Sequence, residues 1–201
     1  MKDTPTSQHV AILCPGPSLP AYWGSWGRTH RPGTSDGQPY GCVIGVNTAA
    51  WKYNVDWMAA VDADVIKPVL AHKKGLKPRA GYITNPGFML PAAMGRRAYP
   101  LATGHPDGQC GYSFPNALAV GIELAGPAGA IDVFGFDCAQ VPTDFTGKPG
   151  QHTADRWREE LTWLRRIWTP RITVFSELAP EVLAWLLVPE AVGNFTPPPI
   201  P

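Results

Sequence analysis

Six short apolar segments constrain the fold of this chain more than any other feature. Their apolar residues run continuously instead of alternating with polar ones, which is typical of strands buried on both faces of a parallel sheet. Helical patterns separate them, and strands that alternate with helices form parallel sheets through right-handed crossovers. We therefore expect an α/β fold with a mostly parallel sheet and helices on both faces. The expected strands are His9–Cys14, Cys42–Val46, Trp57–Val61, Gly81–Thr84, Ile131–Phe136 and Ile172–Phe175.

The expected helices follow from apolar spacing and from capping residues. The most regular pattern runs from about Thr153 to Trp168, where tryptophan and leucine side chains recur on one stripe. Arg156 and Glu160 are four residues apart and are expected on the outer side of this helix. Ser113 is expected to cap the preceding helix, which ends near Ala125. Two shorter helices are expected over Thr48–Tyr53 and Pro180–Leu187.

Composition excludes several classes of protein. Hydrophobic residues make up 44% of the 201, so the chain is not wholly disordered, and no apolar run is long enough to span a membrane. The formal net charge of +1 does not indicate a nucleic-acid-binding scaffold, although a weakly held nucleic acid stays open as an acceptor. The N-terminus lacks a secretory signal pattern, and the four cysteines form no C-x-x-C pair. Buried, reduced thiols and a cytoplasmic location are expected.

The chain is expected to form one α/β domain over residues 1–195, with a Pro-rich, flexible tail over residues 196–201. Two segments without regular patterns, Trp23–Tyr40 and Asn85–Gln109, are typical of lids or binding loops. An apolar segment near the C-terminus, Val182–Val188, could pack on a second copy of the chain, so a homo-oligomer is one expectation.

Both irregular segments contain residues with two interpretations. Arg96 and Arg97 could close over phosphates as part of a lid, because guanidinium groups bind phosphates in a bidentate manner, or they could be solvated loop residues. Trp23 and Trp26 could stack on a base or a sugar, or they could anchor their loop.

Small polar or acidic residues follow four of the expected strands. These residues are Ser18, Asn47, Asp62 and Asp137. Ligands of open parallel sheets bind at the carboxyl ends of the strands, so this pattern predicts a binding site there, although turn residues are also common at strand ends. Gly16 allows a sharp turn and a close approach to a ligand.

Asp62 and Asp64 form an Asp-x-Asp motif at the end of a strand. Two carboxylates at this spacing can hold Mg²⁺ or Mn²⁺, which prefer hard oxygen ligands and can bridge a diphosphate. The alternative is that one acid contacts substrate or caps the following helix while the other faces solvent.

The order of these motifs resembles one known superfamily. P-G-P-S-L follows the first strand, and V-I-G-V-N-T-A-A, D-W-M-A-A-V-D-A-D, S-F-P-N-A-L-A-V-G-I-E-L-A-G and I-D-V-F-G-F-D follow in turn, before a histidine. The series resembles the Rossmann-like superfamily of bacterial sialyltransferases, MAF-type flagellin-modification proteins and archaeal-type 6-hydroxymethylpterin pyrophosphokinases. The resemblance covers about residues 10–176 and implies a single Rossmann-like domain. Small versions of this fold are common in bacteriophage genomes, which is consistent with a phage origin.

The resemblance implies roles for individual residues. Gly16, Pro17 and Ser18 correspond to the phosphate loop of the superfamily, and Asn47 corresponds to its nucleotide-contacting Asn. Asp62 corresponds to the acid after the third strand, and Gly135 and Asp137 correspond to a G-x-D motif. His152 corresponds to the general base. His105 is a competing base, and His152 has the alternative of being a solvated residue before a helix. This chain is shorter than the sialyltransferases and lacks the tyrosine-rich stretch before their histidine.

The expected function is a nucleotide-dependent transferase. The first choice is a glycosyltransferase that moves a sugar from a nucleotide-sugar donor to a hydroxyl-bearing acceptor, with His152, Asp137 and Asp62 as catalytic residues. The alternatives are an ATP-dependent pyrophosphokinase for a hydroxymethyl acceptor such as a pterin, with a metal ion on Asp62 and Asp64, and a non-catalytic nucleotide-binding or sequestering protein.

Overall fold

The structure is a computed structural model of the 201-residue chain. It describes residues 8–23, 40–71, 77–84, 90, 95–98, 111–137, 154–176 and 180–187. Both expected lid segments lie largely outside these ranges, as does the expected tail. Among the described residues, no helix is long and apolar enough to cross a membrane.

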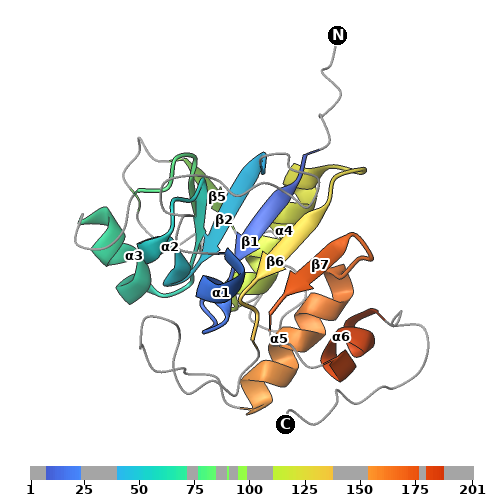
Figure 1. The fold of residues 1–201 in the computed structure, drawn as a ribbon. Coiled ribbons are helices and arrows are strands. Elements are labelled where there is room, and N and C mark those ends of the chain that lie inside the picture. The colour runs from blue at the N-terminus through green and yellow to red at the C-terminus, as the bar shows by residue number, and fades with distance from the viewer. Residues whose placement is uncertain are drawn as a thin grey trace.

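A seven-stranded sheet in the order β5-β4-β3-β2-β1-β6-β7 forms the centre of the molecule (Figure 1). All six neighbouring pairs are parallel. The expected α/β, Rossmann-like architecture is therefore confirmed. The strands are β1 (Val10–Leu13), β2 (Cys42–Val46), β3 (Trp57–Ala59), β4 (Gly81–Thr84), β5 (Arg96–Ala98), β6 (Ile131–Phe134) and β7 (Ile172–Phe175).

The strand order reverses next to β1. From β1 the chain adds β2 to β5 in one direction and then returns to place β6 on the other side of β1. The connections that leave β1 and β6 therefore run to opposite sides of the sheet. A crevice opens at such a reversal, and ligands of open α/β sheets bind there.

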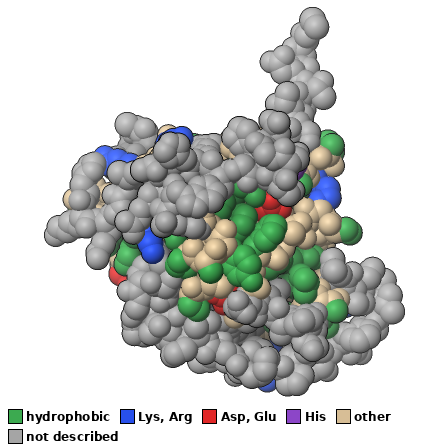
Figure 2. Space-filling view, viewed as in Figure 1, with side chains coloured by type: hydrophobic (Ala, Val, Ile, Leu, Met, Phe, Trp, Pro, Cys, Tyr) green, Lys and Arg blue, Asp and Glu red, His purple; other side chains and the backbone are tan. Residues whose placement is uncertain are grey.

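Helices cover both faces of the sheet (Figure 1). Strand side chains alternate between the two faces, so Val10 and Ile12 belong to one apolar cluster while Ala11 and Leu13 belong to the other. On the side that faces the viewer, hydrophobic side chains gather at the centre (Figure 2). The helices α1 (Leu19–Trp23), α2 (Ala49–Lys52) and α3 (Ala63–Leu70) lie on this side, and α4 (Ser113–Ala125), α5 (Ala154–Ile167) and α6 (Pro180–Leu187) lie behind it.

The longer helices match the expected ranges, with two corrections to individual residues. Tyr112, not Ser113, occupies the N-cap position of α4, and Ser113 is the first helical residue. Glu160 is buried, with only 5% of its surface exposed, so it does not lie on the outer side of α5. Its position is three residues after Trp157 and four before Leu164, which places it on the apolar stripe.

Two irregular segments contain elements that the sequence patterns did not predict. Arg96 and Arg97 belong to the edge strand β5 and pair with Tyr82 and Ile83 of β4, so they are not part of an irregular loop. The sequence did not predict β5, because this strand has only three residues and no alternation of apolar and polar side chains.

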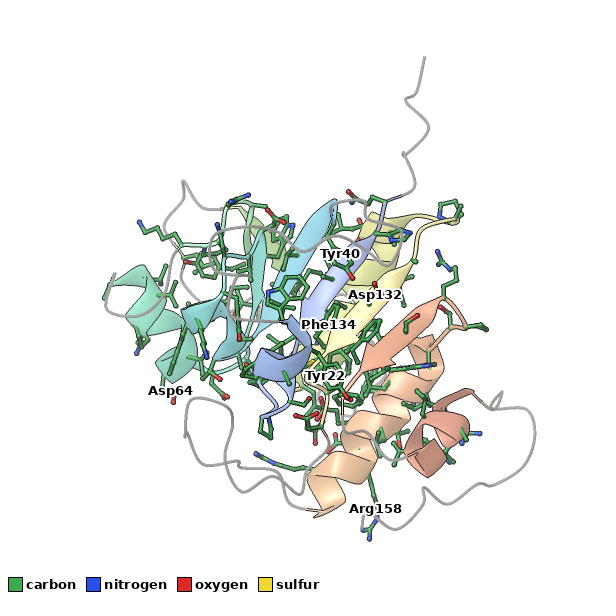
Figure 3. All side chains as sticks on the ribbon, in the orientation of Figure 1. Tyr22, Tyr40, Asp64, Asp132, Phe134 and Arg158 are labelled. Atoms are coloured by element: carbon green, nitrogen blue, oxygen red, sulfur yellow. The ribbon has the colours of Figure 1, made fainter. Side chains whose placement is uncertain are left out.

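Trp23 ends the helix α1 and is buried, which favours the anchor interpretation over stacking on a ligand. Its ring packs edge-on against Phe134 at 4.9 Å and lies 5.7 Å from Tyr40. The Tyr40 hydroxyl donates a 2.5 Å hydrogen bond to Asp132 Oδ2, and the two side chains point toward one another (Figure 3). These contacts fasten α1 onto β6, so they also hold the loop between β1 and α1 in place.

The C-terminal apolar segment is used within the chain. Val182, Trp185 and Leu186 of α6 are buried and belong to the same cluster as Leu161 and Leu164 of α5. The guanidinium of Arg165 lies over the Trp185 ring, 4.6 Å from its centre. This face of α6 therefore packs against α5 within the chain, and the expected homo-oligomer stays a prediction.

Candidate functional site

The four polar residues that follow strands all lie at the same edge of the sheet. Asp62, Asn47, Ser18 and Asp137 follow β3, β2, β1 and β6, which are four consecutive strands in the sheet order. Because all these strands are parallel, their carboxyl ends meet at one edge. Three of them belong to two separate hydrogen-bonded groups, with Ser18 and Asp137 at the β1–β6 reversal and Asn47 at the end of β2.

Ser18 and Asp137 form the first group, across the strand-order reversal. The Ser18 backbone N–H donates a 2.6 Å hydrogen bond to Asp137 Oδ2, and the Ser18 hydroxyl donates to Asp137 Oδ1. Ser18 is buried and Asp137 is half-buried. Two donors on one carboxylate fix its orientation. Ser18 therefore positions an acidic group at the strand-order reversal.

The backbone donors of the Gly16–Ser18 loop are all engaged within the protein. The Gly16 N–H bonds to the Gly135 carbonyl at 2.9 Å, the Ser18 N–H bonds to Asp137, and the Leu19 N–H bonds to the Gly16 carbonyl at 3.1 Å. Pro17 has no N–H to offer. The donors expected to face a phosphate thus face a carboxylate and carbonyl groups. In this conformation the loop acts as a support for Asp137.

Two glycines permit this close arrangement. A Cβ atom on Gly16 would lie 2.2 Å from the Gly135 carbonyl oxygen and 2.3 Å from Asp137 Oδ2. Gly135 has a φ of 69°, and a Cβ atom there would lie 2.6 Å from the Cys14 carbonyl oxygen. Any larger residue would push the β1 loop away from the end of β6. Both residues were expected to bind a nucleotide. In the structure, their lack of side chains allows Ser18 to approach Asp137 closely enough for hydrogen bonds.

Asn47 forms the second group, with Ser113 and Val61. Its backbone adopts a left-handed conformation with a φ of 49°, and its N–H donates to the Ala59 carbonyl at 2.8 Å. The Ser113 hydroxyl donates a 2.9 Å hydrogen bond to Asn47 Oδ1 and accepts a 3.1 Å hydrogen bond from the Val61 N–H. Ser113 therefore ties the start of α4 to the ends of β2 and β3.

The Asp-x-Asp pair lies at the start of α3. Asp62 occupies the N-cap position but makes no side-chain capping hydrogen bond, and Asp64 lies in the first turn (Figure 3). Both side chains are exposed. Within the described ranges, no group of three His, Cys, Asp or Glu side chains comes together. A divalent ion on Asp62 and Asp64 would therefore need further oxygen ligands from a bound phosphate or from water.

The strand-end pattern did not identify three further residues, which are Cys14, Glu160 and Tyr112. Cys14 is a buried, free thiol at the end of β1. Burial raises the pKa of Cys14, and the negative charges of Glu160 and Asp137 raise it further. Cys14 is therefore held as a neutral thiol, not as a nucleophile. Glu160, which belongs to α5, is itself buried.

Tyr112 is the third of these residues, and it lies immediately before α4. Burial raises the pKa of the Tyr112 hydroxyl, and so does the 2.7 Å hydrogen bond that it donates to Glu159. This bond links the start of α4 to α5. The burial of Glu160 could have been predicted from its position on the apolar stripe of α5. No sequence pattern indicated the role of Tyr112.

The two histidines expected as bases, His152 and His105, lie outside the described residues. The described part of α5 begins two residues after His152 and belongs to the chain segment that follows Asp137. The role of His152 as a general base therefore stays a prediction.

Comparisons of this chain with family models, with curated proteins and with solved structures gave no match. The functional argument therefore rests on the geometry at the carboxyl edge of the sheet.

Proposed function

We propose that this protein is a nucleotide-dependent transferase that moves a sugar from a nucleotide-sugar donor to a hydroxyl-bearing acceptor. The observation that carries the proposal is the Ser18–Asp137 pair at the β1–β6 reversal. This pair lies where open α/β sheets bind nucleotides, and its carboxylate is held in a fixed orientation.

Asp137 is suited to a hydroxyl group because a carboxylate only accepts hydrogen bonds. A carboxylate oxygen can accept more than one hydrogen bond, so the bonds from Ser18 do not by themselves prevent a hydroxyl from binding to Asp137. In the transfer step, the acceptor hydroxyl oxygen forms a bond to the sugar carbon, and the bond from that carbon to the nucleotide phosphate breaks. The hydroxyl proton passes to a base, for which Asp137 and His152 are the residues we propose.

The nucleotide portion of the donor is proposed to lie over the ends of β1 and β2. Asn47 is half-buried at this edge, next to the β1 loop, because β1 and β2 are paired throughout. A ligand that spans Asn47 and Asp137 meets a neutral amide at one end and an acidic group at the other. The phosphate is best placed toward Asn47, since a phosphate beside Asp137 would be repelled by its negative charge.

Two other functions would leave different signs in solution. A pyrophosphokinase would need Mg²⁺ or Mn²⁺ on Asp62 and Asp64 together with ATP, and a sequestering protein would bind a nucleotide without turnover. The superfamily resemblance supports all three functions, whereas a carboxylate in a fixed orientation, which can accept a hydrogen bond from an acceptor hydroxyl, favours transfer to an alcohol.

The test is a thermal-shift screen of the full chain against ATP, GTP, CMP, UDP and sugar conjugates of CMP and UDP, each with and without Mg²⁺. A ligand at 100 times its Kd should stabilise the protein by about 2.7 kcal/mol. We expect stabilisation by a nucleotide-sugar, followed by slow metal-independent release of the sugar. Stabilisation by ATP only with Mg²⁺ would favour the pyrophosphokinase, and no stabilisation by any nucleotide would contradict the proposal.

A further inference from the structure

The side chain of Asn47 has a defined orientation because of the residues behind it. An asparagine amide has a carbonyl oxygen that accepts hydrogen bonds and an NH₂ group that donates two. Which of the two faces a ligand decides what kind of group the residue can recognise. At Asn47 the choice is set by Ser113 and by the backbone of Val61.

The Val61 backbone N–H can only donate, so it occupies a lone pair of the Ser113 hydroxyl oxygen. The hydroxyl proton of Ser113 then needs an acceptor, since Ser113 is 4% exposed and cannot turn to water. Among the described residues, Asn47 Oδ1 supplies that acceptor at 2.9 Å. The carbonyl end of the amide therefore points at Ser113, and the NH₂ end points away from it.

We infer that Ser113 is a positioning residue that makes Asn47 present its two N–H donors to the ligand. The group bound at Asn47 is then an oxygen acceptor of the nucleotide, either a phosphate oxygen or a carbonyl oxygen of the base. This inference rests on the proposed function, because it assigns a chemical polarity to one part of the same site. Asn47 supplies donors and Asp137 supplies an acceptor, so the two ends of the site select opposite kinds of group.

The decisive variant is Asn47→Asp, which replaces only the NH₂ group by an oxygen. Asp can still accept the Ser113 hydrogen bond, and Asp tolerates the left-handed backbone that Asn47 adopts. The fold should therefore persist. The loss of the donors, together with repulsion if the acceptor is a phosphate, should weaken the Kd for the nucleotide of the screen by at least roughly tenfold.

Ser113→Ala tests the positioning role, and Ser113→Thr tests rescue. Without the hydroxyl, the Asn47 amide is free to rotate, so we expect Ser113→Ala to weaken the nucleotide Kd severalfold. Ser113→Thr keeps a hydroxyl and should bind close to the wild-type affinity. Thr162→Ala is the matched control, because among the described residues its exposed hydroxyl bonds within α5, to the Arg158 carbonyl. It should bind as the wild type does.

Calorimetry with the nucleotide and with its parent nucleoside separates the outcomes. If Asn47→Asp weakens only nucleotide binding, the acceptor is a phosphate oxygen; if it weakens both, the acceptor is a base carbonyl. Wild-type affinity in Asn47→Asp, with the wild-type protein binding the nucleotide, would overturn this inference and leave the proposed function standing. Failure of the wild-type protein to bind any nucleotide would overturn both.

Discussion

Asp137→Asn is expected to lower turnover of the nucleotide-sugar substrate by about 10²–10⁴-fold, the usual effect of losing a general base. The substitution removes the charge and keeps the shape. The Ser18 N–H can still donate to the amide oxygen, and the Ser18 hydroxyl can accept from the amide NH₂. The melting temperature should therefore change little. The measurement is steady-state kinetics, in which kcat falls while the KM for the donor stays nearly constant.

The control for Asp137→Asn is Asp132→Asn. Asp132 is also an aspartate of the same segment, but it lies within β6 and accepts its hydrogen bond from Tyr40. It should leave kcat unchanged. Wild-type turnover in Asp137→Asn, combined with a large loss of kcat in His152→Ala, would show that the base is His152 and that Asp137 has a structural role. A large loss of melting temperature with intact turnover would lead to the same conclusion.

Gly16→Ala is expected to destabilise the protein by about 3 kcal/mol, the upper part of the range for overpacked sites. The added methyl would lie 2.2 Å from the Gly135 carbonyl oxygen and 2.3 Å from Asp137 Oδ2, so the loop or the end of β6 must move. For a chain of this length, that destabilisation lowers the melting temperature by roughly 6–12 °C. Because the same movement separates Ser18 from Asp137, nucleotide binding should also weaken.

Gly111→Ala provides the matched glycine control. Gly111 is exposed, and a Cβ atom there would meet nothing within 4 Å among the described residues. Its melting temperature should stay within about 2 °C of the wild type, the usual range for an exposed site. If Gly16→Ala behaves like Gly111→Ala in both stability and nucleotide binding, then the close packing of Gly16 against Gly135 and Asp137 does not hold in solution.

The sheet could be predicted from the sequence because its strands are buried on both faces. The segments Cys42–Val46, Gly81–Thr84 and Ile172–Phe175 match β2, β4 and β7 residue for residue. Three others, over β1, β3 and β6, were expected to be longer, since Cys14, Val61 and Phe136 continue the apolar runs after the ladder has ended. The edge strand Arg96–Ala98 could not be recognised, because two of its three residues are charged and its pairing is decided by the neighbouring β4.

The candidate site could be predicted as a set of strand ends but not as a set of contacts. Ser18, Asn47 and Asp137 were expected at one edge, and they lie there. That Ser18 donates to Asp137 could not be foreseen, because it depends on how β6 returns beside β1. The hydrogen bond between Ser113 and Asn47 also could not be foreseen, because the two residues are 66 positions apart in the sequence and meet only through tertiary packing.

The most direct test of the nucleotide site is a ¹H–¹⁵N chemical-shift titration of the protein with the nucleotide selected by the screen. We predict the largest shifts at the amides of Gly16, Ser18, Asn47 and Asp137, which lie at the carboxyl ends of β1, β2 and β6. The amides of Gly41, Ala130 and Arg171 lie at the opposite ends of β2, β6 and β7 and should stay unchanged. Shifts confined to those three, with none at the carboxyl ends, would contradict the location of the site.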